Sequence, residues 1–140
     1  MIHGTMPRAA KGRVAPPPKL PAAAQRVADR VAAMPGVIAQ AHWEIGSQTE
    51  VNGTDFYVDE HEVGHIHLDG EAHIALGAAL GREVIAQGLA RRFRWSDAFV
   101  VVDTAQAPDR AVQLFALRLE QLAGVDARTL RARVAALAAT

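Results

Sequence analysis

Four of the six histidines lie within residues 59–73, at positions 61, 65, 67 and 73, and their spacing fits two kinds of site. If this segment is helical, His61, Glu62 and His65 form the His-Glu-x-x-His signature of zinc peptidases. In that motif the histidines bind zinc and the glutamate activates a bound water. If the segment is a strand, His65 and His67 point to the same face of a sheet. The local backbone therefore decides which chemistry is available.

Residue preferences favour the strand. Gly64 is a poor interior helix residue, Val63 and Ile66 are β-branched, and Asp69-Gly70 is a strong turn signal. Alternation along a strand directs one set of side chains to the core: Gly64, Ile66 and Leu68. It directs the other set to the opposite face: His61, Val63, His65 and His67.

The peptidase interpretation remains the alternative function, and its weakness is the third zinc ligand. In the longer form of the motif, Leu68 stands where a glycine is needed and Glu71 where a third histidine is needed. A glutamate from a second helix, such as Glu83 or Glu120, would have to complete the site.

On a strand, His65 and His67 place their imidazoles about 7 Å apart on one face, close enough to share a metal ion with a third residue. Neutral imidazole needs no deprotonation near neutral pH, which suits zinc or another divalent metal. The third ligand would come from a neighbouring strand: His42, Glu44, Asp55 or His73. The simpler interpretation is favoured, because paired histidines without an established third ligand are a weak signal. In it the two histidines are ordinary polar residues, hydrogen bonded to Tyr57, Glu44 or Asp55.

The elements that must position these residues follow from hydrophobic periodicity and from glycine and proline. Helices are expected over residues 22–34, 76–87 and 108–122 and after Asp126; strands are expected over 37–45, 54–58, 61–68, 92–95 and 98–102. This order predicts an α+β domain with a two-layer arrangement: a mainly antiparallel sheet of about five strands, with helices packed on one face. Strand parity then assigns a polar set to the opposite face: Gln40, His42, Glu44, Asp55, Tyr57, His65, His67, Arg92 and Arg94.

Length and composition indicate one domain. The chain has 140 residues, of which 50% are hydrophobic and 21% charged, as expected of one globular core. Residues 1–20 are rich in proline, alanine and basic side chains, and Pro16-Pro17-Pro18 forces an extended conformation. We therefore expect a disordered tail over residues 1–20 and a single α+β domain over residues 21–140.

Charge and cysteine content exclude several classes of function. Fifteen basic residues balance fifteen acidic ones, so the broad positive field of a nucleic-acid binder is absent. The absence of cysteine excludes disulfides, thiolate metal sites and a cysteine nucleophile. No apolar run is long enough to span a bilayer, and the expected location is the cytoplasm.

Two further binding modes have some support. Arg91, Arg92 and Arg94 alternate with Phe93 and Trp95, a pattern that could pair phosphates and stack bases. Nucleic-acid binding is disfavoured because both aromatic rings are better placed in the core. Homodimerisation through an apolar helix stripe or the uncovered sheet face is another alternative, supported only by how common symmetric dimers are.

Several short motifs between residues 35 and 122 resemble a known family. They are Pro35-Gly36-Val37, Thr54-Asp55-Phe56, Glu62-Val63-Gly64-His65-Ile66-His67, and Arg82-Glu83-Val84 through Gly88. Together they resemble the luciferase-domain (luciferase-like) family of small bacterial proteins of unknown function, with Gly-His-x-His the most specific element. Gly77, Ala78 and Ala79 replace the prolines that usually begin the following helix. The resemblance implies an α+β domain and a strand at the histidines, but it implies no reaction.

The sequence therefore predicts an uncharacterised ligand- or protein-binding module rather than a catalyst. The expected ligand site comprises His42, Glu44, Asp55, Tyr57, His65 and His67, with His65 and His67 as the metal ligands if a metal is present.

Overall fold

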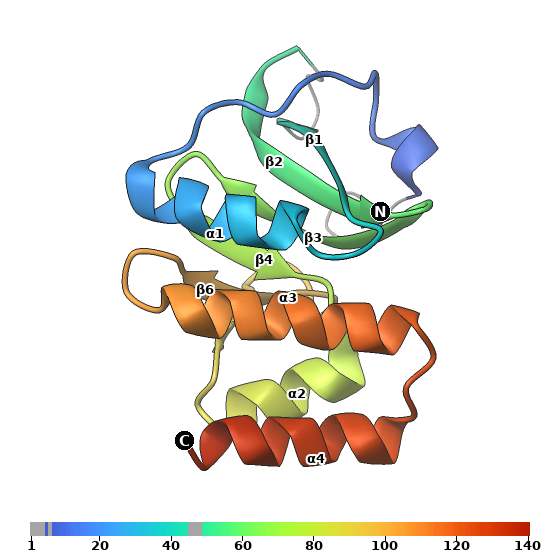
Figure 1. The fold of residues 1–140 in the computed structure, drawn as a ribbon, viewed down its shortest axis with the longest axis vertical. Helices are drawn as coiled ribbons and strands as arrows, with labels where there is room; N and C mark the ends of the chain where they lie inside the picture. The colour runs from blue at the N-terminus through green and yellow to red at the C-terminus, as the bar shows by residue number, and fades with distance from the viewer. Residues whose placement is uncertain (1–4, 6, 45–48) are drawn as a thin grey trace.

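The computed structural model describes residue 5 and residues 7–44 and 49–140. Six antiparallel strands form one sheet in the order β1-β2-β3-β4-β6-β5, with helices α1 to α4 gathered on one side of it (Figure 1). The elements are a short 3-10 helix η1 (Arg8–Ala10), α1 (Ala22–Ala32), β1 (Ile38–Trp43), β2 (Val51–Val58), β3 (His61–His67), β4 (Glu71–Ile74), α2 (Ala78–Ala86), β5 (Arg91–Arg92), β6 (Val100–Asp103), α3 (Pro108–Leu122) and α4 (Ala127–Ala138). The predicted α+β architecture is confirmed.

The sheet has one strand more than the prediction, and the additional strand is β4. It directly follows the Asp69-Gly70 turn, and four residues give too short an alternation to recognise in the sequence. In β4, Ala72 and Ile74 join the hydrophobic core, while His73 turns to the opposite face, where its ring contacts other histidines. β4 pairs with both β3 and β6, so it lies inside the sheet.

Helices α1 and α3 pack directly on the sheet. α3 packs on β3, β4 and β6, and α1 packs on α3 and β2, while α2 and α4 lie together below α3 (Figure 1). Asp126 caps α4 as predicted, because its carboxylate accepts a hydrogen bond from the Thr129 N–H at 2.8 Å. Within the described residues, no helix is both long enough and apolar enough to cross a bilayer.

Close contact between sheet and helix depends on Gly64. The rings of Phe56 and Phe115 meet edge to face at 5.4 Å in the core. A Cβ atom added at Gly64 would lie 2.8 Å from the Phe115 ring and 2.4 Å from the His73 carbonyl oxygen. A residue with a side chain would therefore push α3 away from the sheet.

β3 contains a bulge that changes its expected alternation. Phe56 pairs with Gly64, but the next residue of β2, Tyr57, pairs with Glu62, so Val63 is an extra residue in β3. Val63 is fully buried in the hydrophobic core, which corrects its predicted place beside the histidines. The bulge brings Glu62, rather than His61, onto the histidine face. Leu68, predicted to be in the core, is 41% exposed.

The segment before α1 makes specific contacts with the sheet. The Ala41 N–H donates to the Ala15 carbonyl at 2.9 Å, and Trp43 Nε1 donates to the Arg13 carbonyl at 2.9 Å. The Arg8 Nε donates to Gln40 Oε1 at 2.9 Å. Residues 8–15 thus contact β1 and the turn that joins β2 to β3.

The residues around β5 also differ from expectation. Phe93 contacts His73, but Trp95 is 57% exposed, with the Arg94 guanidinium 4.4 Å above its ring. The prediction that Trp95 faces the core is wrong. β5 is only two residues long, so the strand ends before Trp95 and leaves this ring at the surface.

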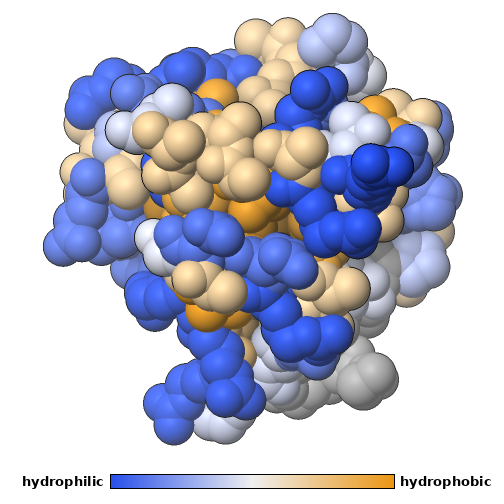
Figure 2. Space-filling model, turned by 90° about the horizontal axis from the view of Figure 1, so that it is seen from below, coloured by the Kyte–Doolittle hydropathy of each residue, from blue (hydrophilic) through white to orange (hydrophobic). Residues whose placement is uncertain are grey.

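A groove of about 340 Å³ lies between α2 and α4, on the helical side of the molecule. Leu76, Leu80 and Leu130 contribute its apolar lining. Figure 2 views this end, where apolar side chains gather near the middle between polar ones. The groove is remote from the polar sheet face, where the histidines lie.

Candidate metal centre

The polar face of the sheet collects four histidines because of strand register. Gly53 of β2 pairs with His42 of β1 on one side and His67 of β3 on the other. His65 pairs with His73 of β4. Since Gly53 has no side chain, the rings of His42 and His67 approach each other across β2, with their centroids 5.0 Å apart.

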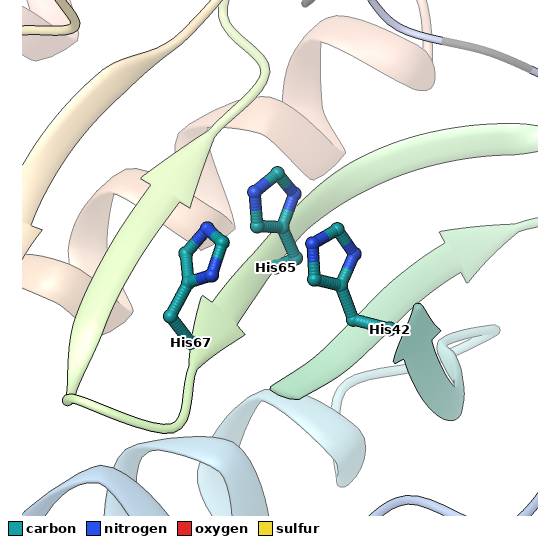
Figure 3. A group of neighbouring side chains, drawn as sticks. All are labelled: His42, His65 and His67. Carbon is teal, nitrogen blue, oxygen red and sulfur yellow. The ribbon is translucent and has the colours of Figure 1, made fainter. Parts of the chain in front are cut away.

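The three rings of His42, His65 and His67 form a compact group, which Figure 3 shows projecting together over the sheet. His42 and His65 are stacked at 4.2 Å with a 7° interplanar angle, and His65 and His67 meet edge to face at 4.8 Å. One nitrogen from each ring lies within 4.8 Å of the other two. Tetrahedral zinc with bonds of about 2.0–2.1 Å needs nitrogens roughly 3.4 Å apart. Because imidazole lone pairs lie in the ring plane, His42 and His65 would also have to turn out of their stacked arrangement to direct both nitrogens at one ion.

His73 and two phenylalanines border this group on the side of β4 and β6. The His73 ring lies 4.5 Å from His67 and 4.9 Å from His65. Phe99 contacts His65 at 5.2 Å, and Phe93 contacts His73 at 4.8 Å. The cluster therefore has an aromatic wall on one flank.

Carboxylates hold one nitrogen of three of the rings. His42 Nδ1 lies 2.7 Å from Asp55 Oδ1, and His65 Nδ1 lies 2.7 Å from Glu62 Oε2. His73 Nε2 lies 2.9 Å from a carboxylate oxygen of Glu71. Metal-binding histidines typically use one nitrogen for the metal and the other for such a hydrogen bond. These pairs orient the rings and leave the second nitrogen of each available.

His67 is held differently. Its Nδ1 lies 3.1 Å from the side-chain amide of Asn52 on β2, which leaves Nε2 for the site. His67 is also the only partly exposed member of the cluster, since His42, His65 and His73 are all buried. Access from solvent is therefore through His67.

Burial favours the neutral form of His65, His67 and His73. Desolvation lowers the pKa of His65 well below its usual value and lowers the pKa of His67 to about 3. Desolvation also lowers the pKa of His73, although its hydrogen bond with Glu71 acts in the opposite direction. Neutral imidazole is the form that binds metals.

The carboxyl side of the cluster is buried too. Desolvation raises the pKa of Glu62 to about 7, while the nearby Lys11 ammonium opposes this rise. The Tyr57 hydroxyl donates to Asp55 Oδ2 at 3.3 Å, and burial followed by repulsion from Asp55 raises the pKa of this phenol. Tyr57 thus acts as a hydrogen-bond donor to the carboxylate that orients His42.

Five of the six predicted ligand-site residues come together on this face: His42, Asp55, Tyr57, His65 and His67. Glu44 does not, because it follows the end of β1 and its side chain is exposed.

Sequence reasoning missed two important neighbours, Glu62 and Lys11, and did not predict the strand that carries a third, His73. Regular alternation in β3 does not bring Glu62 to the face of His65, because a bulge cannot be recognised from alternation. His73 is one of the candidate third ligands named from the sequence, although the four-residue strand β4 that carries it is not predicted. Lys11 was placed in a tail, although its ammonium lies 3.2 Å from Glu62 Oε1.

The extended backbone of β3 does not support the peptidase alternative. His61–His67 is an extended strand, and His61 is exposed outside the histidine cluster. A His-Glu-x-x-His zinc site needs both histidines on one helical face. Glu62 instead contacts His65 directly, as a partner of its Nδ1.

Comparison with known proteins gives one match. The family model described as Luciferase domain matches residues 60–120, which run from the start of β3 into α3. No curated protein and no solved structure matches the chain. The matched segment includes His65, His67 and His73, whereas His42 and Asp55 lie before it. The match agrees with the resemblance seen in the Gly-His-x-His motif, and residues 60–120 are similar to the Luciferase domain family.

Proposed function

We propose that this protein is a metal-binding module that holds a divalent transition metal through His42, His65 and His67. The observation that carries the proposal is the convergence of three imidazoles from two strands, with one nitrogen of each within 4.8 Å of the others. Zinc is the best candidate, because it commonly binds three histidines in a tetrahedral site. Nickel, copper and cobalt also accept imidazole ligands.

The surroundings support the same conclusion. Burial keeps the pKa values of His65 and His67 low, so neither ring must lose a proton to bind a metal near neutral pH. Asp55 and Glu62 orient His42 and His65 in the manner of carboxylates behind metal-bound histidines.

Three protein ligands leave a fourth coordination position on tetrahedral zinc. A small external ligand with an oxygen or nitrogen donor could occupy it from the side of His67, which is the partly exposed histidine. The proposed activity is therefore binding, of a metal and through it of a small ligand.

The test is metal analysis of protein purified without a histidine tag, followed by zinc titration. We expect one zinc per chain, and we expect the double variant His65→Ala/His67→Ala to lose it. His61→Ala is the matched control, since His61 is on the same strand but exposed outside the cluster. Circular dichroism verifies that each variant is folded. Zinc binding that survives the double substitution, or a wild-type chain that binds no divalent metal, would disprove the proposal.

A further inference from the structure

The carboxyl side of the cluster contains a second set of converging donors. Asp55, Glu62 and His65 each offer one ligand atom, and these atoms lie within 4.8 Å of one another. All three side chains are buried. This set shares His65 with the trihistidine group but differs in chemistry, because two of its three donors are carboxylate oxygens.

A positive charge already lies at this position. The Lys11 ammonium is 3.2 Å from Glu62 Oε1 and 3.8 Å from Asp55 Oδ1, and its side chain is only 10% exposed. Lys11 is not part of the sheet: it is the residue that follows η1, in the segment before α1. A side chain from a peripheral segment thus fills the space between two buried carboxyl groups.

The fit of Lys11 is incomplete. Glu62 Oε1 and Gln40 Nε2 are buried side-chain atoms that have no hydrogen-bond partner among the described residues. The Lys11 ammonium and Glu62 Oε1, which are 3.2 Å apart, form an ion pair. Gln40 pairs with Asp55 across β1 and β2, so the two side chains lie on the same face of the sheet. An unpartnered buried oxygen and an unpartnered buried donor are expected where a cation and its bound water belong.

We propose that Asp55, Glu62 and His65 form a second divalent-cation site, which the Lys11 ammonium occupies until the N-terminal segment moves aside. A divalent ion supplies two positive charges to two carboxyl groups, whereas Lys11 supplies one. Oxygen-rich donor sets favour Mn²⁺ and Mg²⁺, whereas the trihistidine group favours zinc. Residues 7–15 then act as a plug that the cation must displace.

Mn²⁺ is the probe, because electron paramagnetic resonance measures its free concentration directly. The titration uses the full chain in a His67→Ala background, which removes the trihistidine site and keeps the second one. Adding Lys11→Met should raise Mn²⁺ affinity by at least about tenfold, since it removes a positive charge within 4 Å of both carboxyl groups. A further Glu62→Gln substitution should abolish this gain.

Lys19→Met is the matched control, since Lys19 lies in the same N-terminal segment and is exposed. Lys11→Gln provides a second route, because it removes the charge with a polar side chain and should give the same gain if Lys11→Met folds poorly. Unchanged Mn²⁺ affinity in folded Lys11 variants, or a gain that persists with Glu62→Gln, would overturn the proposal. Zinc binding by the wild-type chain is measured separately, so failure of either site is distinguishable from failure of the other.

Displacement of Lys11 also has a structural readout in the wild-type chain. The Ala41 N–H donates to the Ala15 carbonyl in the N-terminal segment. Saturation with Mn²⁺ should release this hydrogen bond and accelerate amide exchange at Ala41, while exchange at Ala72, inside the sheet, stays unchanged. Protection of Ala41 that survives Mn²⁺ saturation would contradict the plug.

Discussion

His42 and His65 each hold one ring nitrogen against a buried carboxylate, and this pairing determines what the residues can do. The hydrogen bond selects the tautomer and directs the second nitrogen away from the carboxylate. A histidine on a solvated strand would rotate freely. The carboxylates therefore hold the rings of His42 and His65 in fixed orientations, as metal ligands require.

The contribution of this orientation can be measured at Asp55. Asp55→Asn removes the charge next to His42 Nδ1 and should weaken zinc binding by about 10- to 100-fold. Titration calorimetry with zinc provides the measurement. Asp59→Asn is the control, because Asp59 is exposed and its positive φ of 52° is tolerated by asparagine. Equal zinc affinities for the two variants would mean that Asp55 does not orient the ligand.

Burial of neutral histidines also predicts how stability depends on pH in the metal-free protein. The folded pKa of His67 is about 3, below its value of about 6.5 in the unfolded chain, so the unfolded state binds more protons as the pH falls. The stability that neutral His67 contributes is fully present above about pH 6.5 and is lost progressively toward pH 3. The His67 contribution at pH 5 should be about 2 kcal/mol lower than at pH 7.

Glu62 acts in the opposite direction, because its pKa is raised from about 4.5 in the unfolded chain to about 7 in the folded protein. Its contribution to stability is fully present below about pH 4.5 and is lost as the pH rises through 7. His65 and His73 reinforce His67, so the histidines should dominate. Urea unfolding at pH 7 and pH 5 measures the change, and His67→Ala should reduce it. Equal pH dependence in this variant would show that His67 does not contribute.

At the scale of elements, the bulge in β3 and the glycine in β2 assemble the site. The bulge at Val63 places Glu62 and His65 on one face although they are three residues apart. Gly53 leaves room for His42 and His67 to meet across β2. Without the bulge, Glu62 and His65 would lie on opposite faces of β3. A side chain at position 53 would stand between the rings of His42 and His67.

Gly64 is the element-scale test of packing between β3 and α3. Gly64→Ala should lower the free energy of unfolding by about 1–3 kcal/mol, because the new methyl group meets both the Phe115 ring and the His73 carbonyl. Chemical denaturation measures this loss. Gly81→Ala is the comparison, since its nearest neighbour is a Val100 methyl group at 3.3 Å and alanine is the better helix former. Similar stability for Gly64→Ala and wild type would contradict the packing argument.

At the scale of the whole molecule, the N-terminal segment completes the polar side of a sheet whose other side is covered by helices. It supplies Lys11 to the carboxyl groups and the Arg13 carbonyl to Trp43. The Arg13 guanidinium also lies 5.0 Å from the Trp43 ring centroid.

Deletion of residues 1–15 tests this contribution. In a Trp95→Phe background, which leaves Trp43 as the reporter, the deletion should shift fluorescence emission to the red because the indole becomes hydrated. It should also lower the free energy of unfolding by at least about 1 kcal/mol, through lost hydrogen bonds. Emission that matches the full chain would show that the segment does not cover Trp43.

The sequence by itself determined the α+β class, most element positions and the strand at the histidines. These features depend on local properties: hydrophobic period, β-branching, glycine and proline. Local alternation also placed His42, Asp55, Tyr57, His65 and His67 on one face. The family resemblance gave the same strand, and residues 60–120 match that family.

Only the tertiary structure decided which donors converge. Glu62 reaches His65 through a bulge, and His73 arrives on a four-residue strand between β3 and β6. Lys11 comes from a segment without hydrophobic periodicity, which contacts the sheet through charge and backbone hydrogen bonds. Register, bulges and long-range ion pairs depend on how distant parts of the chain meet, and local sequence patterns carry no record of that.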